Sequence, residues 1–120
     1  MKVRAFRGAT QLVADDALEM ESAVCELLEE IFAANSLDRD DLISILFTCT
    51  PDIRSEFPAK TARSLALGSV PLICAVEMDV PNAMARVIRV MVHAHSELAL
   101  GEARHIYRRG AEALRRDLAQ

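Results

Sequence analysis

DALEMESAVCELLEEIFAANS, residues 16–36, carries the longest regular hydrophobic pattern in the chain and decides its fold class. Its apolar residues recur three and four positions apart, which predicts one long amphipathic helix. Asp15 or Asp16 caps this helix, and Asn35 and Ser36 end it. The apolar stripe consists of Met20, Ala23, Val24, Leu27, Leu28, Ile31 and Phe32. We expect this stripe to bury one helix face against a sheet.

The segments around this helix are short and rich in branched apolar residues, as strands are. VRAFR at 3–7 alternates apolar and basic residues, and Gly8 and Thr10 suggest a bend after it. LISILFT at 42–48 is almost continuously apolar, which favours a strand covered on both faces. VIRVMVHAH at 87–95 alternates like a strand, although its period also permits a helix.

The remaining segments add shorter elements. Pro58 suits the first position of a short helix within SEFPAKTARSL at 55–65, and Gly68 suits its end. Two more strands are expected at VPLICAVEMD (70–79) and RHIY (104–107), and a last helical segment at AEALRRDL (111–118). The pattern is therefore α+β, with about five strands, one long helix and two short helices in a single domain spanning 1–120.

The overall composition excludes several classes of protein. Hydrophobic residues make up 52% of the chain, which excludes intrinsic disorder. The net charge of −4 gives no general attraction to nucleic acid or anionic membranes, and the apolar runs are too short to span a bilayer. Cys25, Cys49 and Cys74 have no CxxC spacing and no secretory signal peptide precedes them, so we expect reduced thiols in a cytoplasmic protein.

Three ionic residues, Arg7, Glu77 and Arg89, lie in or beside segments that otherwise build the core. An ion buried there alone is costly, so each needs a partner or an exposed strand face. One interpretation is therefore an open face or a structural ion pair such as Glu77 with Arg89. The other is a pocket for a polyanion, because several converging arginines suit a small dicarboxylate. The further cations at 60, 63, 115 and 116 favour the pocket.

Other reactive side chains give weaker signals. His93 and His95 share one strand face and can hold a metal, but without a third ligand, packed or solvated histidines are favoured. Cys74 reads as a packed thiol, and Tyr107 is either an interface residue or a hydroxyl donor to a ligand. The sequence has no Walker loop, GxGxxG or Ser-His-Asp spacing. It therefore favours binding, or a reaction that needs only positioning and electrostatics, with no metal or cofactor.

Several motifs match a known family, in order and along nearly the whole chain. They are RAFRGAT (4–10), TPDI-x-x-x-FPAK-x-x-R (50–63), VP-x-x-C-x-x-EMDV (70–80), IRVM (88–91), RH-x-Y (104–107) and LR-x-DL (114–118). Through these segments the chain resembles the small monofunctional chorismate mutases of the Bacillus type. The resemblance implies a mixed five-stranded sheet with one long helix, assembled as a barrel-like homotrimer with active sites between subunits. It makes 87–95 a strand, and it implies rearrangement of chorismate to prephenate on the way to phenylalanine and tyrosine.

The resemblance also implies roles for individual residues. Arg89 would face the breaking ether oxygen, Glu77 would approach the ring hydroxyl, and Arg7 with Tyr107 would bind the side-chain carboxylate. The other expected substrate-binding residues are Phe57, Ala59, Lys60 and Arg63 of the neighbouring subunit, Ile73 and Cys74 near Glu77, and Leu114 and Arg115 of the C-terminal segment. The alternatives are a small enamine deaminase or a non-catalytic carboxylate-binding trimer, but both lack the FPAK-x-x-R and EMDV segments.

Overall fold

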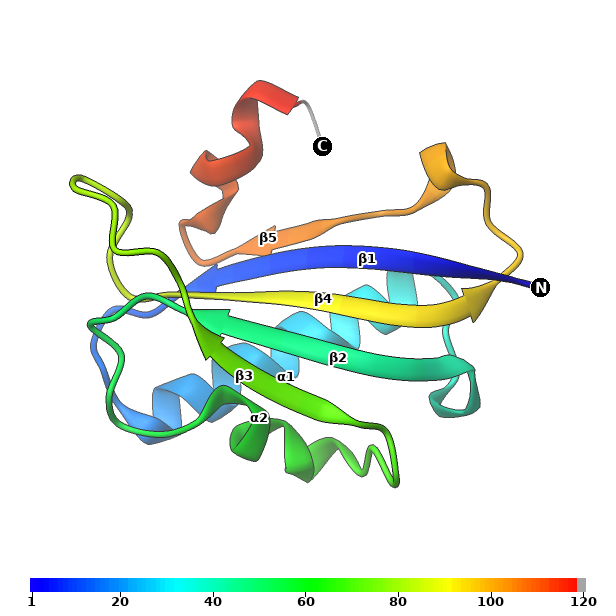
Figure 1. Ribbon diagram of the computed structural model, residues 1–120, viewed down its shortest axis with the longest axis horizontal. Helices are drawn as coiled ribbons and strands as arrows, with labels where there is room; N and C mark the ends of the chain where they lie inside the picture. The colour runs from blue at the N-terminus through cyan, green and yellow to red at the C-terminus, as the bar shows by residue number, and fades with distance from the viewer. Residues whose placement is uncertain (119–120) are drawn as a thin grey trace.

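The computed structural model describes residues 1–118. Five strands of this part of the chain form one mixed sheet in the order β3-β2-β4-β1-β5 (Figure 1). The strands are β1 Lys2–Gln11, β2 Leu42–Cys49, β3 Leu72–Val76, β4 Val87–Ser96 and β5 Ile106–Arg108. β4 pairs antiparallel with β1 and β2, whereas the edge strands β3 and β5 run parallel to β2 and β1. The α+β class and the strand predicted at 87–95 are confirmed.

The helical segments are α1 Ala17–Ala34 and α2 Pro58–Thr61, with 3₁₀ turns η1 Arg39–Asp41, η2 Ala62–Leu65, η3 Leu100–Glu102 and η4 Ala111–Leu118. Side chains are described as far as position 114. Among the described residues, no helix has both the length and the apolarity that crossing a bilayer requires. The last helical segment is present at the residues predicted for it.

Helix α1 forms as its hydrophobic pattern predicts and lies along one face of the sheet, behind the strands in Figure 1. Asp16 is the N-cap, and its Oδ2 accepts a hydrogen bond of 2.9 Å from the amide of Glu19. All seven residues of the predicted apolar stripe are buried in the core. The helix ends at Asn35, and Ser36 then takes a φ of +53°. The period of 3.6 was therefore sufficient to predict this element and its buried face.

Gly8 lies inside β1, so the bend predicted at Gly8 and Thr10 is wrong. β1 continues to Gln11 because it pairs with β4 along its whole length. The glycine serves a close approach instead of a turn. A Cβ at this position would lie 2.8 Å from Cδ1 of Ile31 on α1 and 2.9 Å from the carbonyl oxygen of Ile106 on β5. Because position 8 has no side chain, α1 and β5 both fit closely against β1.

The elements around β3 are shorter than predicted. β3 covers Leu72–Val76 instead of 70–79, because it pairs only with Ile45–Cys49 at the end of β2. The helix before it begins at Pro58 as predicted, but its 3₁₀ continuation stops at Leu65. Ala66 takes the left-handed φ of +54° that ends it, two residues before Gly68. The chain therefore turns out of regular structure earlier than the sequence indicates.

β5 also differs from its prediction, since it covers Ile106–Arg108 instead of 104–107. Arg104 is excluded from the strand because Asn35 binds both of its backbone groups. The Arg104 amide donates to Asn35 Oδ1 at 2.8 Å, and its carbonyl oxygen accepts from Asn35 Nδ2 at 2.9 Å. The end of α1 therefore fixes the position from which β5 starts.

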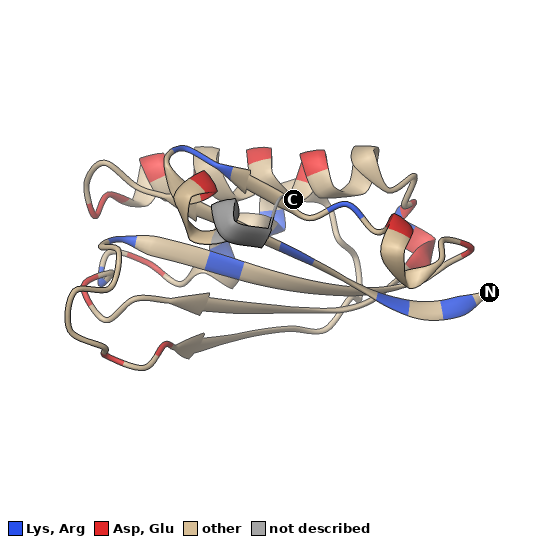
Figure 2. Ribbon diagram, turned by 90° about the horizontal axis from the view of Figure 1, so that it is seen from above, with Lys and Arg blue, Asp and Glu red and all other residues tan. Residues whose placement is uncertain are grey.

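In the single chain, α1 and α2 leave the other sheet face largely uncovered among the described residues. In β2, Ile45 and Phe47 are buried on the α1 side, while Leu46 between them is 37% exposed. The expectation that β2 is covered on both faces is therefore wrong for one chain, because α1 lies on one side only. Figure 2 shows acidic positions along α1 and basic positions on the strands. Of the strand arginines, Arg7 and Arg89 face the uncovered side, whereas Arg108 of β5 reaches Glu30 on α1.

Candidate active site

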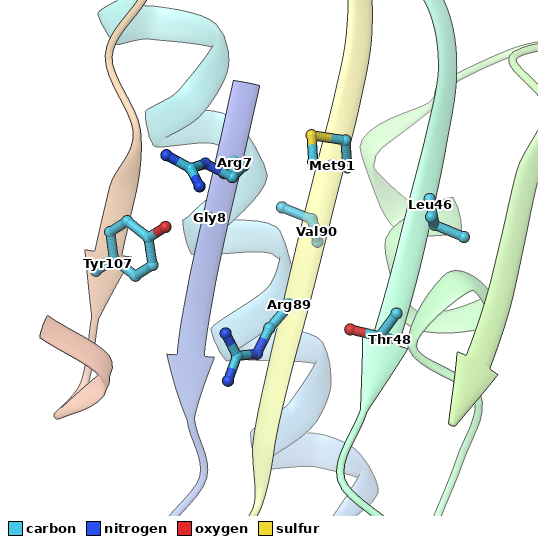
Figure 3. A pocket seen from close by; sticks show the side chains of 8 residues that line it. All are labelled: Arg7, Gly8, Leu46, Thr48, Arg89, Val90, Met91 and Tyr107. Carbon is cyan, nitrogen blue, oxygen red and sulfur yellow. The ribbon is translucent and has the colours of Figure 1, made fainter. Parts of the chain in front are cut away.

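A pocket of about 190 Å³ lies on the uncovered face, across the middle of the sheet. Its lining residues are Arg7, Gly8, Leu46, Thr48, Arg89, Val90, Met91 and Tyr107 (Figure 3). Two arginines and a tyrosine therefore border one space, although they come from β1, β4 and β5. The structure brings together three residues that the sequence proposed as ligand contacts. An anion in this pocket would meet a concentrated positive charge.

The register of the strands explains how these side chains meet. Arg89 on β4 lies opposite Ala9 of β1 on one side and opposite Thr48 of β2 on the other. Ala9 also pairs with Tyr107 of β5. Residues two apart on a strand share a face, so Arg7 lies beside Ala9 on this same surface. Because Ala9 carries only a methyl group, it leaves room between the larger polar side chains around it.

Glu77 anchors Arg89 at the edge of the pocket. Its Oε2 lies 3.1 Å from Nε of Arg89 and accepts a hydrogen bond of 2.6 Å from Oγ1 of Thr48. The Glu77 amide donates to the carbonyl oxygen of Cys49 at 2.9 Å. The ion pair considered from the sequence is present, yet the Arg89 side chain is 46% exposed and that of Glu77 is 16% exposed. The pair therefore orients Arg89 and still leaves its guanidinium open to the pocket.

Tyr107 is held in place through contacts of two nearby residues of the chain, His105 and Arg108. The Arg7 amide donates to Nδ1 of His105 at 3.0 Å, and Nε of Arg108 donates to Oε2 of Glu30 on α1 at 2.6 Å. The Tyr107 ring is buried in a small apolar cluster with Ala9, Met84, Val87, Ala111 and Leu114. Leu114 thus contacts the surroundings of Tyr107, whereas the side chain of Arg115 lies outside the described residues. The C-terminal segment is docked beside the pocket through this cluster.

The residues expected to serve a neighbouring subunit lie apart from the pocket. Phe57 is the N-cap of α2 and is 69% exposed. Lys60 is also exposed, and its Nζ lies 3.2 Å from Oε2 of Glu56. The amide of Phe57 and the Lys60 ammonium hold the pKa of the Glu56 carboxyl below its usual value. Arg63 follows on η2 with an exposed side chain. In one chain, this group forms a separate cationic and aromatic surface.

The two predicted residues of β3 point to opposite faces. Cys74 points to α2, where its Sγ accepts a hydrogen bond of 3.2 Å from the amide of Ala59, as a packed thiol does. Ile73 lies opposite Leu46 on the uncovered face and is 63% exposed. Burial raises the pKa of the neighbouring Cys49 thiol, and Cys74 adds to this shift. Because Cys74 points to α2, Ile73 is the one of these two residues that continues the surface around the pocket.

Sequence reasoning missed several residues that line the pocket, above all Thr48, Leu46 and Met91. Alternation along β2 and β4 already contained part of the signal, because Leu46 and Thr48 lie two residues apart. Their positions opposite Met91 and Arg89 depend on the register between strands that are far apart in the sequence.

Among the described residues, no group of three His, Cys, Asp or Glu side chains is placed to hold a metal ion. Of the two histidines considered as metal ligands, His93 has its Nδ1 3.3 Å from Oγ of Ser44.

Comparisons with known proteins point in one direction. The profile of the family described as chorismate mutase type I matches residues 3–118. The chain is 38% identical over 117 residues to chorismate mutase AroH of Thermus thermophilus, covering 97% of this chain and 96% of that protein. It is 35% identical over 120 residues to chorismate mutase AroH of Bacillus subtilis (strain 168), covering 99% and 94%. The solved structure of a chorismate mutase from Clostridium thermocellum superposes with a TM-score of 0.88 at 38% identity, covering 91% of this chain and 97% of that one.

Proposed function

The chain belongs to the type I family of chorismate mutases, which are isomerases, and we propose that it converts chorismate to prephenate in a cleft built around Arg89. The observation that carries the proposal is the Arg89 guanidinium, anchored by Glu77 at a pocket that it shares with Arg7. Two arginines at one pocket suit a small dicarboxylate. We propose that the enzyme acts in the cytoplasm, in aromatic amino-acid biosynthesis, without a metal or cofactor.

The reaction is a one-step rearrangement, so the site has to position the substrate and stabilise charge. The substrate must be held with its side chain folded over its ring, which brings the two carbons that form the new bond together. In our proposal, Arg7 and Tyr107 bind the side-chain carboxylate. Lys60, Arg63 and Arg115 supply further positive charge for the two carboxylates. None of these roles requires a nucleophile or a general base.

Charge stabilisation is the role that we assign to Arg89 and Glu77. The ether C–O bond breaks ahead of C–C bond formation, so negative charge builds on the oxygen and positive charge on the ring. A guanidinium fixed beforehand stabilises the oxygen without rearranging during the reaction. Arg89 meets this condition, because its Nε is bound to Glu77 and its backbone is paired on both sides. Glu77 then offsets the positive charge of the ring or orients its hydroxyl.

We further propose that a homotrimer completes the cleft. Pockets that enclose a small molecule usually measure at least about 300 Å³, whereas one chain provides about 190 Å³. Ile73 and Leu46 expose apolar surface beside the pocket, and Phe57 exposes an aromatic ring on α2. Exposed apolar patches of this kind mark protein interfaces. The family resemblance implies three subunits, so the stable assembly should have three times the chain mass of 13.2 kDa in sedimentation experiments.

In this assembly the remaining predicted residues have distinct tasks. Phe57, Ala59, Lys60 and Arg63 border the cleft of the neighbouring subunit. Ile73 and Cys74 line the cleft near Glu77, and the Cys74 sulfur also accepts a hydrogen bond from the Ala59 amide of α2. Leu114 and Arg115 help to close the cleft from the C-terminal segment. These assignments rest on the family resemblance, and the exposure of α2 is consistent with them.

The proposal is tested by incubating the purified protein with chorismate and following the loss of its enol-ether absorbance. Acid treatment of the product should then yield phenylpyruvate, which identifies it as prephenate. Loss no faster than in buffer alone would contradict the proposal. An enamine deaminase or a metabolite-sensing trimer would leave chorismate unchanged, and neither is favoured by the family match over residues 3–118.

A further inference from the structure

We infer that Thr48 is a positioning residue that keeps the Glu77 carboxylate from binding Arg89 through both of its oxygens. A pair of that kind would occupy an N–H donor of Arg89 that the substrate needs. This inference rests on the proposed function, in which Arg89 donates to the substrate. Thr48 Oγ1 donates to Oε2 of Glu77 at 2.6 Å, and Nε of Arg89 lies 3.1 Å from the same oxygen. The hydroxyl and the guanidinium therefore converge on one of the two carboxylate oxygens.

The two donors fix this oxygen from both sides. Thr48 and Arg89 are directly opposite each other on β2 and β4, so their side chains approach Oε2 from neighbouring strands. The Glu77 amide is bound to Cys49 of β2, which also fixes the start of the side chain. A carboxylate has two oxygens with about four acceptor positions. Because Oε2 takes both contacts, Oε1 is the oxygen left to accept a hydroxyl group of the substrate.

Without the threonine hydroxyl, the ion pair has a more favourable arrangement available. Arginine and carboxylate groups often form a bidentate pair with two parallel N–H···O bonds. Glu77 lies just after β3, and the Thr48 hydroxyl ties its Oε2 to β2. Without that hydroxyl, the carboxylate can turn about its terminal torsion, which has broad minima, and face Arg89 with both oxygens. A bidentate pair would occupy an additional N–H donor of Arg89. Fewer donors would then remain for the ether oxygen in the transition state.

The test compares Thr48→Val with Thr48→Ser. Valine keeps the shape and the strand preference and removes the donor, whereas serine keeps the donor. The free energy of a hydrogen bond to a charged group corresponds to a factor of about 10 to 100. Because Thr48→Val would remove one Arg89 donor from the transition state, we expect it to lower kcat by about that factor. KM should change less than threefold, because the contacts that the protein makes with the two carboxylates of the substrate remain. Thr48→Ser should restore kcat to within about threefold of the wild-type value. Ser44→Ala is the matched control, since this hydroxyl lies on the same strand but contacts His93.

Two further measurements separate this role from a purely structural one. In a Glu77→Gln background, Thr48→Val should add less than about a threefold loss, because the carboxylate through which it acts is already gone. A crystal structure of the Thr48→Val variant should show both Glu77 oxygens on Arg89. The inference is overturned by a wild-type kcat in Thr48→Val, by an equal loss in Thr48→Ser, or by an unchanged Glu77 side chain in the crystal. Absence of turnover in the wild-type enzyme would instead overturn the proposed function, and the crystal structure would still test the positioning.

Discussion

Gly8→Ala tests the close contacts on which the position of β5, and therefore of Tyr107, depends. The added methyl group would lie 2.8 Å from Ile31 Cδ1, 3.1 Å from Leu27 Cδ1 and 2.9 Å from the Ile106 carbonyl oxygen. The two side-chain carbons can rotate away, but the carbonyl belongs to the backbone of β5. Ile106 is the first residue of β5 to pair with β1, opposite Gly8 itself. The strand must therefore move away from β1 and carry Tyr107 with it.

Overpacking of this kind costs about 1–3 kcal/mol, and the loss of glycine flexibility in the unfolded chain offsets about 0.4–1 kcal/mol. We therefore expect a net loss of about 1–2 kcal/mol in urea unfolding at a fixed protein concentration, and a Tm lower by about 3–8 °C. KM for chorismate should rise because Tyr107 shifts. Gly101→Ala is the control, since nothing lies within 4 Å of its added carbon. A Gly8→Ala variant with wild-type stability and KM would refute this reasoning.

Two other variants test the charges outside the pocket. Burial alone would raise the pKa of Asp15, but the hydrogen bonds from Ser55 and from the Arg54 amide outweigh it and lower the pKa below 3.8. The stability from this carboxylate is thus present above pH 3.8 and lost as the pH falls further, so Asp15→Asn should lower Tm at neutral pH and match the wild type in acid. A Tm difference that persists in acid would contradict this. Lys60→Ala should raise KM about 10-fold with little change in kcat, as loss of a charged contact does. Lys2→Ala is its control, and a wild-type KM in Lys60→Ala would remove Lys60 from the cleft.

Local patterns predicted the elements whose cause is local. The buried face of α1 follows from a period that only its own residues define, and every residue of that face was predicted. Gly8 was misread because glycine has two common uses, in turns and at close approaches. The close packing of α1 and β5 against Gly8 shows which of the two uses applies, and the residues next to Gly8 in the sequence do not reveal it. The start of β5 depends on Asn35, which is 69 residues from Arg104 and leaves no pattern near the strand.

The same distinction applies to the site. The sequence indicated Arg7, Glu77 and Arg89 as candidates, because burying an ion without a partner among apolar residues is costly. In the structure these three residues lie around one pocket or at its edge. Thr48 was not visible, because a threonine in a strand is ordinary until the register places it opposite Arg89. The roles of Phe57 and the other α2 residues depend on contacts between chains. The pattern of one chain does not specify these contacts, so these roles stay predictions.

The role of Arg89 is tested most simply by the steady-state kinetics of Arg89→Ala with chorismate as substrate. A positive charge that acts only in the transition state should be lost from kcat and from kcat/KM together. By analogy with removal of an oxyanion donor, we expect kcat/KM to fall by about 10³-fold or more. Arg39→Ala, which removes an exposed guanidinium stacked on Phe32, should keep wild-type kinetics. Near-normal turnover in Arg89→Ala would contradict the assignment of Arg89 to the ether oxygen, and with it the proposed mechanism.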